Sequence, residues 1–390
     1  MLEKSKKTMD NEKGIKEGGR LANLVVAGSF ASITGGLGLM NSIGIYQAWL
    51  STHQLASRTH SEVSWIFGVY NFLIFFGGLQ IGPVFDAKGP RGLLWLGSAM
   101  LVLMFVVLGF CEKYWQFFVV LGVLGGIGTS FIFIVPVASV GHFFHRKRGA
   151  ATGLAMSGGS LGGVVFPIML ENLAPKIGFA WATRAIGLVT LVLLLVGCLL
   201  VRGRPTGNTT NKSSMDSDVE ESSRKREPAK ARDGQNRKYK ELLPDLTILR
   251  SPALALTTAG VFFIEWGFFI PLEYITSYAL AHGISPNLAY LMVVFLNAGS
   301  FPGRWIPGIL ADRVGRFNTL IATNVLTLVA VLAVWLPAGG NVAATVVFSV
   351  VFGFSSGSNI SLVPVCVGEL CPTENYGRFY TTVYTIVSLG

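Results

Sequence analysis

Long stretches without a charged residue are the feature that most constrains how this chain folds. No Asp, Glu, Lys or Arg occurs between Arg20 and Arg58 or between Arg316 and Glu369. A helix crosses a bilayer with about 20 apolar residues, and only a helix or closed barrel satisfies its backbone groups there. The second stretch is long enough for two such helices. An all-α polytopic membrane protein is therefore predicted.

The apolar runs predict ten complete spans. An eleventh begins near Phe379, and the 12 residues from there through Gly390 are too few to cross a bilayer. We therefore expect about 11 helices, with the second half incomplete. The complete spans are expected at 24–49, 63–85, 92–110, 115–139, 150–170, 182–201, 253–280, 287–311, 317–336 and 342–364.

The net charge of +10 is unevenly distributed. With the N-terminus in the cytoplasm, 26 of the 31 Lys and Arg residues lie on the cytoplasmic side and four on the other, and Arg304 lies within the membrane. Basic residues favour the cytoplasmic side of a membrane. The charge therefore indicates topology and a lipid partner, with no nucleic-acid partner, and the plasma membrane is the expected location. Oligomeric state is left open, with a monomer expected.

Composition divides the chain into four parts. Residues 1–23 form a polar N-terminal tail, and 24–201 an N-terminal six-helix bundle. Residues 202–250 contain few large apolar side chains, which is typical of a disordered linker. Residues 251–390 then form the incomplete C-terminal bundle.

A short motif occurs at matching places in the two halves. "GPVFDAKGPR" occupies 82–91 and "GILADRVGRF" occupies 308–317, each at the end of the second span of its half. Gly82, Asp86 and Gly89 recur at a constant offset of 226 residues. Internal repeats of this kind are typical of transporters whose halves rock about a central site. Transport by alternating access is the function that the repeat predicts.

The second copy of the motif resembles the signature of the major facilitator superfamily. Two further strings resemble its monocarboxylate transporter family, and the fungal branch in particular: "EGGRLAN" before the first span, and "HFFHRKRGAATGLAMSGGSLGG" at 142–163. The resemblance implies a major facilitator fold of two pseudo-symmetric halves. Asn41 replaces the lysine of animal members in the first span, and Ser300 replaces an aspartate.

Arg304 is the strongest candidate for a substrate-binding residue, because a charge within a membrane is costly and functional by default. Tyr290, Asn297 and Arg304 recur every seven residues, with Ser300 one turn away. This spacing predicts a polar stripe along one helix. The guanidinium can bind a carboxylate through two parallel hydrogen bonds. A structural role, in an interhelical ion pair or a clamp on carbonyl groups, is the alternative.

Glu265 is the expected companion of Arg304, and Asn41 is included in the same substrate-binding and coupling set. Glu265 lies roughly 18 Å into its span at 1.5 Å per residue. A carboxylate at that depth can serve as a proton-coupled switch, or can form a fixed structural pair with the arginine. Glu273 lies nearer the outer mouth, and Asn71, Gln80, Asn324 and Asn359 are further candidates for residues that line a cavity.

The acids and bases of the repeated motif are interpreted as gating residues. The carboxylates can pair with bases or with a facing helix N-terminus in one conformational state only. The basic cluster at 146–148 is interpreted instead as a simple anchor at the cytoplasmic face. The gating set is Asp86, Arg91, Asp312, Arg313 and Arg316.

No enzymatic, metal or cofactor site is expected. The strings "GGSLG" (158–162) and "GFSSG" (353–357) match a nucleophile pattern, but they lie within predicted helices, where small residues allow close packing. No pair of the four cysteines has zinc-ligand spacing with histidines nearby.

The sequence therefore predicts a secondary active transporter of a small organic solute. The expected substrates are organic anions that resemble monocarboxylates. Proton coupling, as in a symporter, is left open. One alternative is an efflux carrier for a fungal metabolite or an uncharged solute. The other is a non-transporting or inactive truncated membrane protein.

The predicted topology implies that two potential N-glycosylation sites are not used. Asn208 and Asn211 begin N-x-S/T sequons within the predicted linker. A cytoplasmic segment never meets the glycosylation machinery, so we expect both to be unmodified in cells. Peptide mapping after glycosidase treatment measures this, and a glycan on either asparagine would contradict the topology.

Overall fold

The computed structural model describes residues 18–203, 249–371 and 376–389. Within these residues the regular structure is entirely helical, as predicted from the charge-free runs. Almost all of the 202–250 linker, with Asn208 and Asn211, lies outside the described residues, as does most of the 1–23 tail.

The first half of the chain forms six membrane-length helical segments. Their order follows the predicted spans, and three of them combine more than one helical element. They are α2 (Arg20–Met40) with α3 (Ile43–Thr52), α4 (His60–Phe76) with α5 (Gly78–Lys88), α6 (Pro90–Leu108), α7 (Tyr114–Phe117) with η1 (Phe118–Gly125) and α8 (Gly126–Phe143), α9 (Arg148–Ile177), and α10 (Phe179–Leu200).

The second half contributes five more helical segments. They are α12 (Pro252–Ala281), α13 (Pro286–Val314), α14 (Arg316–Val329) with η3 (Ala330–Trp335), α15 (Val342–Val367) and α16 (Tyr376–Val387). Among the described residues, nine segments are long and apolar enough to cross a membrane. The 29-residue helix α13 is not among them, and it carries Arg304, Asp312 and Arg313.

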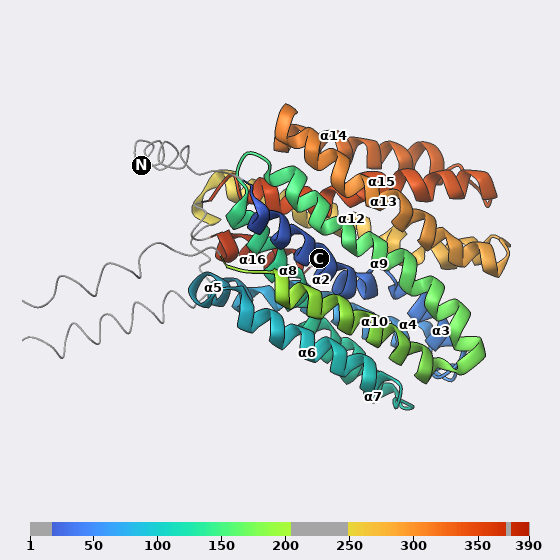
Figure 1. Cartoon of the computed structure of the whole chain (residues 1–390). Helices are drawn as coiled ribbons and strands as arrows, with labels where there is room; N and C mark the ends of the chain where they lie inside the picture. Colours follow the sequence, from blue (N-terminus) through green and yellow to red (C-terminus); the bar gives the residue numbers. More distant parts are fainter. Residues whose placement is uncertain (1–17, 204–248, 372–375, 390) are drawn as a thin grey trace, which may run out of the picture.

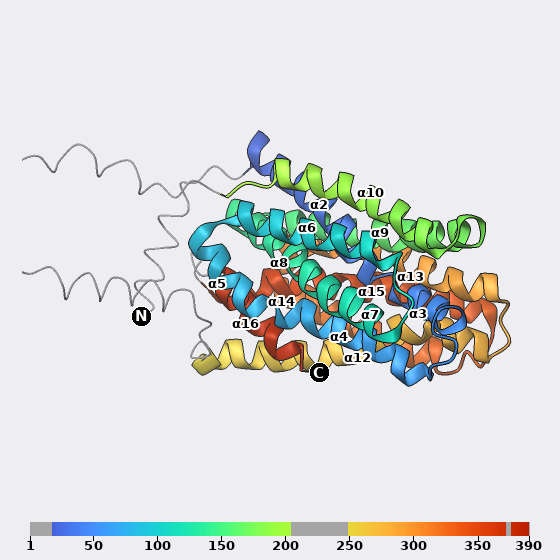
Figure 2. The ribbon, with the colours of Figure 1, turned by 90° about the horizontal axis from the view of Figure 1, so that it is seen from below.

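The helices run side by side in one bundle, and α13 lies against both α9 of the first half and α15 of the second (Figures 1 and 2). Helix α2 packs against α9 and α10, and α16 packs against α5. Three helices, α9, α13 and α2, therefore bring residues of both halves to the centre of the bundle.

Glycines allow this close contact. A Cβ atom on Gly353 of α15 would collide with the carbonyl oxygen of Leu296 on α13, and one on Gly153 of α9 would collide with the carbonyl oxygen of Arg304. Small residues at helix contacts let backbones approach closely in a membrane protein. The glycine-rich strings that resemble a nucleophile pattern thus serve packing, since both lie within helices α9 and α15.

The repeated motif forms equivalent turns in the two halves. Gly89 ends α5 with φ of 77°, and Gly315 ends α13 with φ of 112°. These are backbone conformations that glycine adopts without a steric penalty. Both turns lie at the end of the bundle that also carries the loop between α8 and α9, and we call this end the basic end.

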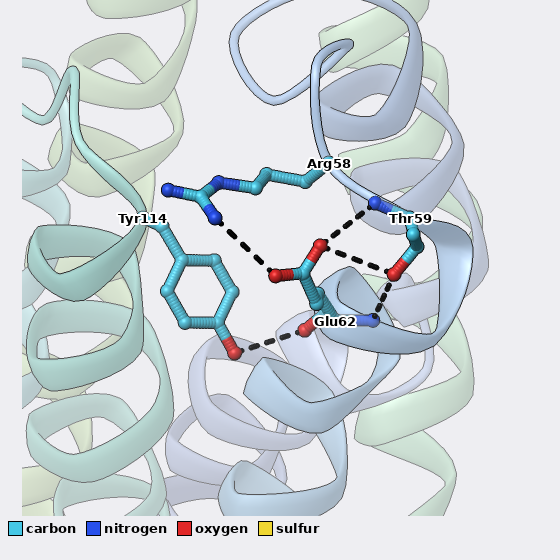
Figure 3. Close-up of polar contacts among 4 residues, drawn as sticks. All are labelled: Arg58, Thr59, Glu62 and Tyr114. Atoms are coloured by element: carbon cyan, nitrogen blue, oxygen red, sulfur yellow. Dashed lines mark hydrogen bonds and ion pairs between the residues drawn. The ribbon is translucent and has the colours of Figure 1, made fainter.

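A network of polar contacts stabilises the loop before α4 at the opposite end (Figure 3). Thr59 and Glu62 form a capping box, in which the Glu62 amide donates to Thr59 Oγ1 (3.3 Å) and the Thr59 amide donates to Glu62 Oε2 (2.9 Å). Arg58 forms an ion pair with Glu62 at 3.3 Å, and the Tyr114 hydroxyl donates to the Glu62 carbonyl at 3.0 Å. The cap provides partners for the Thr59 and Glu62 amides, and the Tyr114 hydrogen bond attaches α4 to α7.

Close helix packing generates a test with a matched control. Gly353→Ala places a methyl group against the Leu296 carbonyl, whereas Gly267→Ala on α12 places one where no atom lies within 4 Å. Alanine is the better helix former, so the control is expected to leave thermal stability unchanged or slightly raised. Overpacking is expected to cost about 2 kcal/mol in Gly353→Ala, seen as a lower melting temperature of the purified protein. Equal melting temperatures in the two variants would contradict this packing.

Candidate functional site

A small cavity lies at the centre of the bundle, between α2 of the first half and α12, α13 and α15 of the second. Its water-accessible volume is about 30 Å³, enough for a water molecule but not for an organic solute. Its polar lining includes five of the six residues predicted for substrate binding and coupling. These are Asn41, Glu265, Asn297, Ser300 and Arg304.

Arg304 connects the two halves at this cavity. Its side chain is only 2% exposed. Its Nη1 donates to the Met156 carbonyl of α9 at 2.8 Å, and its Nε donates to Ser300 Oγ at 3.2 Å. Ser160 of α9 donates to the same Ser300 oxygen at 3.0 Å. The guanidinium is thus held by α9 and α13 together, with the cavity beside it.

Glu265 shares the cavity with Arg304 but does not form an ion pair with it in the part of the chain that the structure describes. The carboxylate is 3% exposed, and its Oε1 accepts a hydrogen bond from Asn359 Nδ2 at 3.0 Å. Asn359 lies on α15, so this acid bridges α12 and α15 within the second half. A buried positive and a buried negative charge therefore lie at one cavity without mutual hydrogen bonds.

Asn41 lies where the first membrane span is interrupted. Helix α2 ends at Met40 and α3 begins at Ile43, so the Asn41 carbonyl is free to accept from Asn297 Nδ2 at 3.2 Å. The Asn41 side chain donates to the Gly159 carbonyl of α9 at 2.9 Å. Interrupted helices at the middle of the membrane commonly form the binding sites of transporters. The break places backbone and side-chain polar groups at the cavity wall.

Tyr290 is the one residue of the predicted substrate-binding and coupling set that does not line the cavity. It is half-buried near the start of α13 and packs against the hydrophobic core instead. The seven-residue stripe continues along the helix, but the cavity reaches only Asn297 and Arg304 on it. A sequence pattern indicates which residues share a helix face, not how far along that face the neighbouring helices leave space.

A second contact between the halves closes the side of the cavity away from the basic end. Asn71 of α4 donates to Glu273 Oε1 of α12 at 2.8 Å. Both residues line a constriction that shares Asn41, Phe269 and Leu272 with the cavity. In the sequence, Asn71 and Glu273 stand out only as polar residues within apolar spans, and nothing there indicates that they pair.

The two repeated aspartates make equivalent contacts at the basic end. Asp312 accepts from the amides of Gly149 and Ala150, both at 2.8 Å, at the start of α9. Asp86 accepts from the amides of Gly377 and Arg378, at 3.1 and 2.8 Å, at the start of α16. Carboxylates are favoured at helix N-termini by the free amides and the helix dipole. Each aspartate therefore joins its own half to the other half.

The arginines of the gating set are placed differently. Arg316 donates to the His145 carbonyl in the loop before α9. Arg91 and Arg313 are exposed, and the structure shows neither with a hydrogen bond to the described residues.

Arg148 is buried rather than being a simple surface anchor, which corrects that expectation. It is 2% exposed, and it donates to the Gly368 carbonyl at 2.8 Å and to the Gly141 carbonyl at 2.6 Å. Its guanidinium also lies 4.6 Å from the ring centroid of Tyr376. The ends of α8 and α15, and therefore the two halves, are joined by this one side chain. The sequence does not indicate this burial, because Arg148 directly follows two other basic residues that are exposed, Arg146 and Lys147.

The four cysteines are free thiols, three of them buried. Burial raises the pKa of Cys371, in the turn after α15, to about 12, so this thiol stays protonated at neutral pH. Among the described residues no group of three His, Cys, Asp or Glu side chains is arranged to hold a metal ion.

Comparison with known proteins agrees with this architecture. Residues 22–390 match the model of the Major Facilitator Superfamily. The chain is 33% identical over 388 residues to the riboflavin transporter MCH5 of Saccharomyces cerevisiae, covering 96% of this chain and 71% of that protein.

Two other fungal relatives are similar at the same level. The MFS-type transporter pytF of Aspergillus terreus is 35% identical over 307 residues, which are 79% of this chain and 95% of that protein. The aspyridones efflux protein apdF of Emericella nidulans is 32% identical over 354 residues, which are 90% of this chain and 66% of that protein. The superfamily and the fungal relatives predicted from the sequence motifs are confirmed. With its helical bundle, its repeated motif and this family match, the chain belongs to the Major Facilitator Superfamily of membrane transporters of small solutes.

Proposed function

We propose that this transporter moves an organic anion that resembles a monocarboxylate, by alternating access and together with a proton. The observation that carries the proposal is the buried Arg304, held between the two halves at the central cavity. A guanidinium offers paired donors that match the geometry of a carboxylate. An anion that binds there contacts both halves at once, so its binding is sensitive to their relative position.

Glu265 is the group that would carry the proton. Because Glu265 and Arg304 share one cavity, their charges compensate each other before substrate binds. A carboxylate substrate would add a second negative charge to a space of low polarity, which is costly. A proton held by Glu265 restores the balance, and the anion and the proton then cross together. The two groups need not touch for this coupling, which agrees with their separate hydrogen-bond partners.

The contacts at the two ends support alternating access. The Asp86 and Asp312 contacts hold the basic end closed, while the Asn71–Glu273 contact constricts the other side. A cavity of about 30 Å³ is too small for an organic solute, so a solute fits only after the helices around it move apart. The concentration of basic residues supports a cytoplasmic location for the basic end. The proposed setting is the plasma membrane, where the protein acts as a monomer.

An uncharged solute or a metabolite for efflux is the second candidate. Two observations support this second candidate. Nε and Nη1 of Arg304 already have partners within the protein, and the cavity already contains one charged group of each sign. The names of the riboflavin and aspyridones relatives agree with solutes larger than a simple monocarboxylate.

Substitution of the two cavity charges tests the proposed function. We expect Arg304→Ala to reduce saturable uptake of labelled organic acids by about tenfold or more, because a hydrogen bond to a charged group contributes about 1.5–3 kcal/mol. Glu265→Gln is expected to keep exchange of substrate across the membrane but to lose stimulation by a pH gradient. The matched control is Glu112→Gln, an exposed acid between α6 and α7. Intact saturable, pH-driven uptake in both cavity variants would contradict the site assignment.

The aspartate contacts generate a second test. Asp312→Ala removes the acceptor for two amides of α9, so the basic end should open more often. Ser356 lines the cavity, and Ser356→Cys adds a thiol there. In that background, Asp312→Ala should make the labelling of this thiol by a thiol reagent, applied from the basic side, about fivefold faster. Lys88→Ala, at an exposed residue that ends α5 on the same side and is not in the gating set, is the control and should leave the rate unchanged. An unchanged rate in Asp312→Ala, measured against protein without the added cysteine, would contradict the gating role.

A further inference from the structure

One wall of the central cavity is aromatic. Phe268 and Phe269 of α12 and Phe352 of α15 line it, together with polar residues that include Asn41 and Arg304. Phe268 and Phe352 meet edge to face, with ring centroids 5.9 Å apart and planes at 77°. Phe269 also meets Phe75 of the first half edge to face, with ring centroids 6.1 Å apart. Phe269 therefore also contacts a ring of the other half, although Phe75 itself does not line the cavity.

This wall is distinct from the aromatic side chains that face outward from the same helix. Phe263 and Trp266 of α12 are 65% and 56% exposed on the outer surface of the bundle, which is the surface available to lipid. Phe268 and Phe269 are only partly exposed and line the cavity, while Phe352 is 1% exposed. The position of the rings around the helix thus separates a lipid-facing set from a cavity-facing set.

We propose that the transported solute contains a planar aromatic or conjugated ring with a polar edge. The inference rests on the proposed function and names the class of substrate that the same cavity selects. A flat ring can lie against the faces and edges of Phe268 and Phe352, where aromatic pairs gain more than from buried area alone. Its polar edge then meets Arg304, Asn297 and Asn41. A short aliphatic acid satisfies Arg304 but leaves the aromatic wall without a partner.

Matched probes separate ring planarity from size and charge. Benzoate is compared with cyclohexanecarboxylate, and benzamide with cyclohexanecarboxamide, by thermal stabilisation of the purified full chain in lipid nanodiscs. In at least one pair, the aromatic probe is expected to bind about fivefold more tightly than the saturated probe. Equal affinities within both pairs, or no binding of any of the four probes, would overturn the inference.

Leucine substitutions then locate the preference. Phe268→Leu and Phe352→Leu should each remove most of the difference between the aromatic and saturated probes, while Phe263→Leu, on the lipid-facing side of α12, should preserve it. Phe268→Leu provides the test if the more deeply buried Phe352→Leu does not fold. Loss of the preference in Phe263→Leu, or its persistence in both cavity variants, would contradict a role for the wall.

The two proposals can fail separately. Binding of both carboxylates that depends on Arg304 without an aromatic preference would leave the proposed function standing and reject the aromatic substrate. Binding of benzamide that depends on Phe268 but not on Arg304 would support the aromatic substrate and reject the organic anion.

Discussion

Every peptide group that faces lipid must find its hydrogen-bond partner within the protein, because hydrocarbon supplies none. Helices meet this demand along most of the described residues, and the interruption after Met40 lies in the interior. At Asn41 the carbonyl freed by the helix break accepts from Asn297, and the neighbouring side chain donates to Gly159. The same constraint gathers Arg304 and Glu265 at the centre, where other helices provide partners for them.

Polar contacts join the halves at both ends of the central cavity, and α9 and α13 pack closely between them. At the basic end each aspartate uses backbone amides of the opposite half, so separation exposes groups that water can satisfy. Arg148 adds a buried cation between two helix ends, beside the ring of Tyr376. Glycines such as Gly153 bring the backbones of α9 and α13 close together between these ends.

The helical fold was predictable because a helix that crosses a membrane needs a long run of apolar residues, and such runs are visible in the sequence. The 226-residue offset also indicated equivalent turns, and Gly89 and Gly315 form them with positive φ. Prediction of the site was less complete. Asn297, Ser300 and Arg304 follow from helix spacing, whereas Tyr290 shares that spacing without reaching the cavity. Arg148 lies beside two other basic residues, and nothing local distinguishes a buried arginine from a surface anchor.

By itself, the sequence determined that this chain crosses the membrane repeatedly, that its halves repeat, and that an arginine lies within the membrane. These properties depend on hydrophobicity and periodicity, which are local. Only the tertiary structure decided which partners the charges have: Asn359 rather than Arg304 for Glu265, and the starts of α9 and α16 for the aspartates. It also decided that three phenylalanines face the cavity while their neighbours face outward. Such pairings depend on how distant helices pack, because contacts in space, not sequence spacing, set the partner of a buried group.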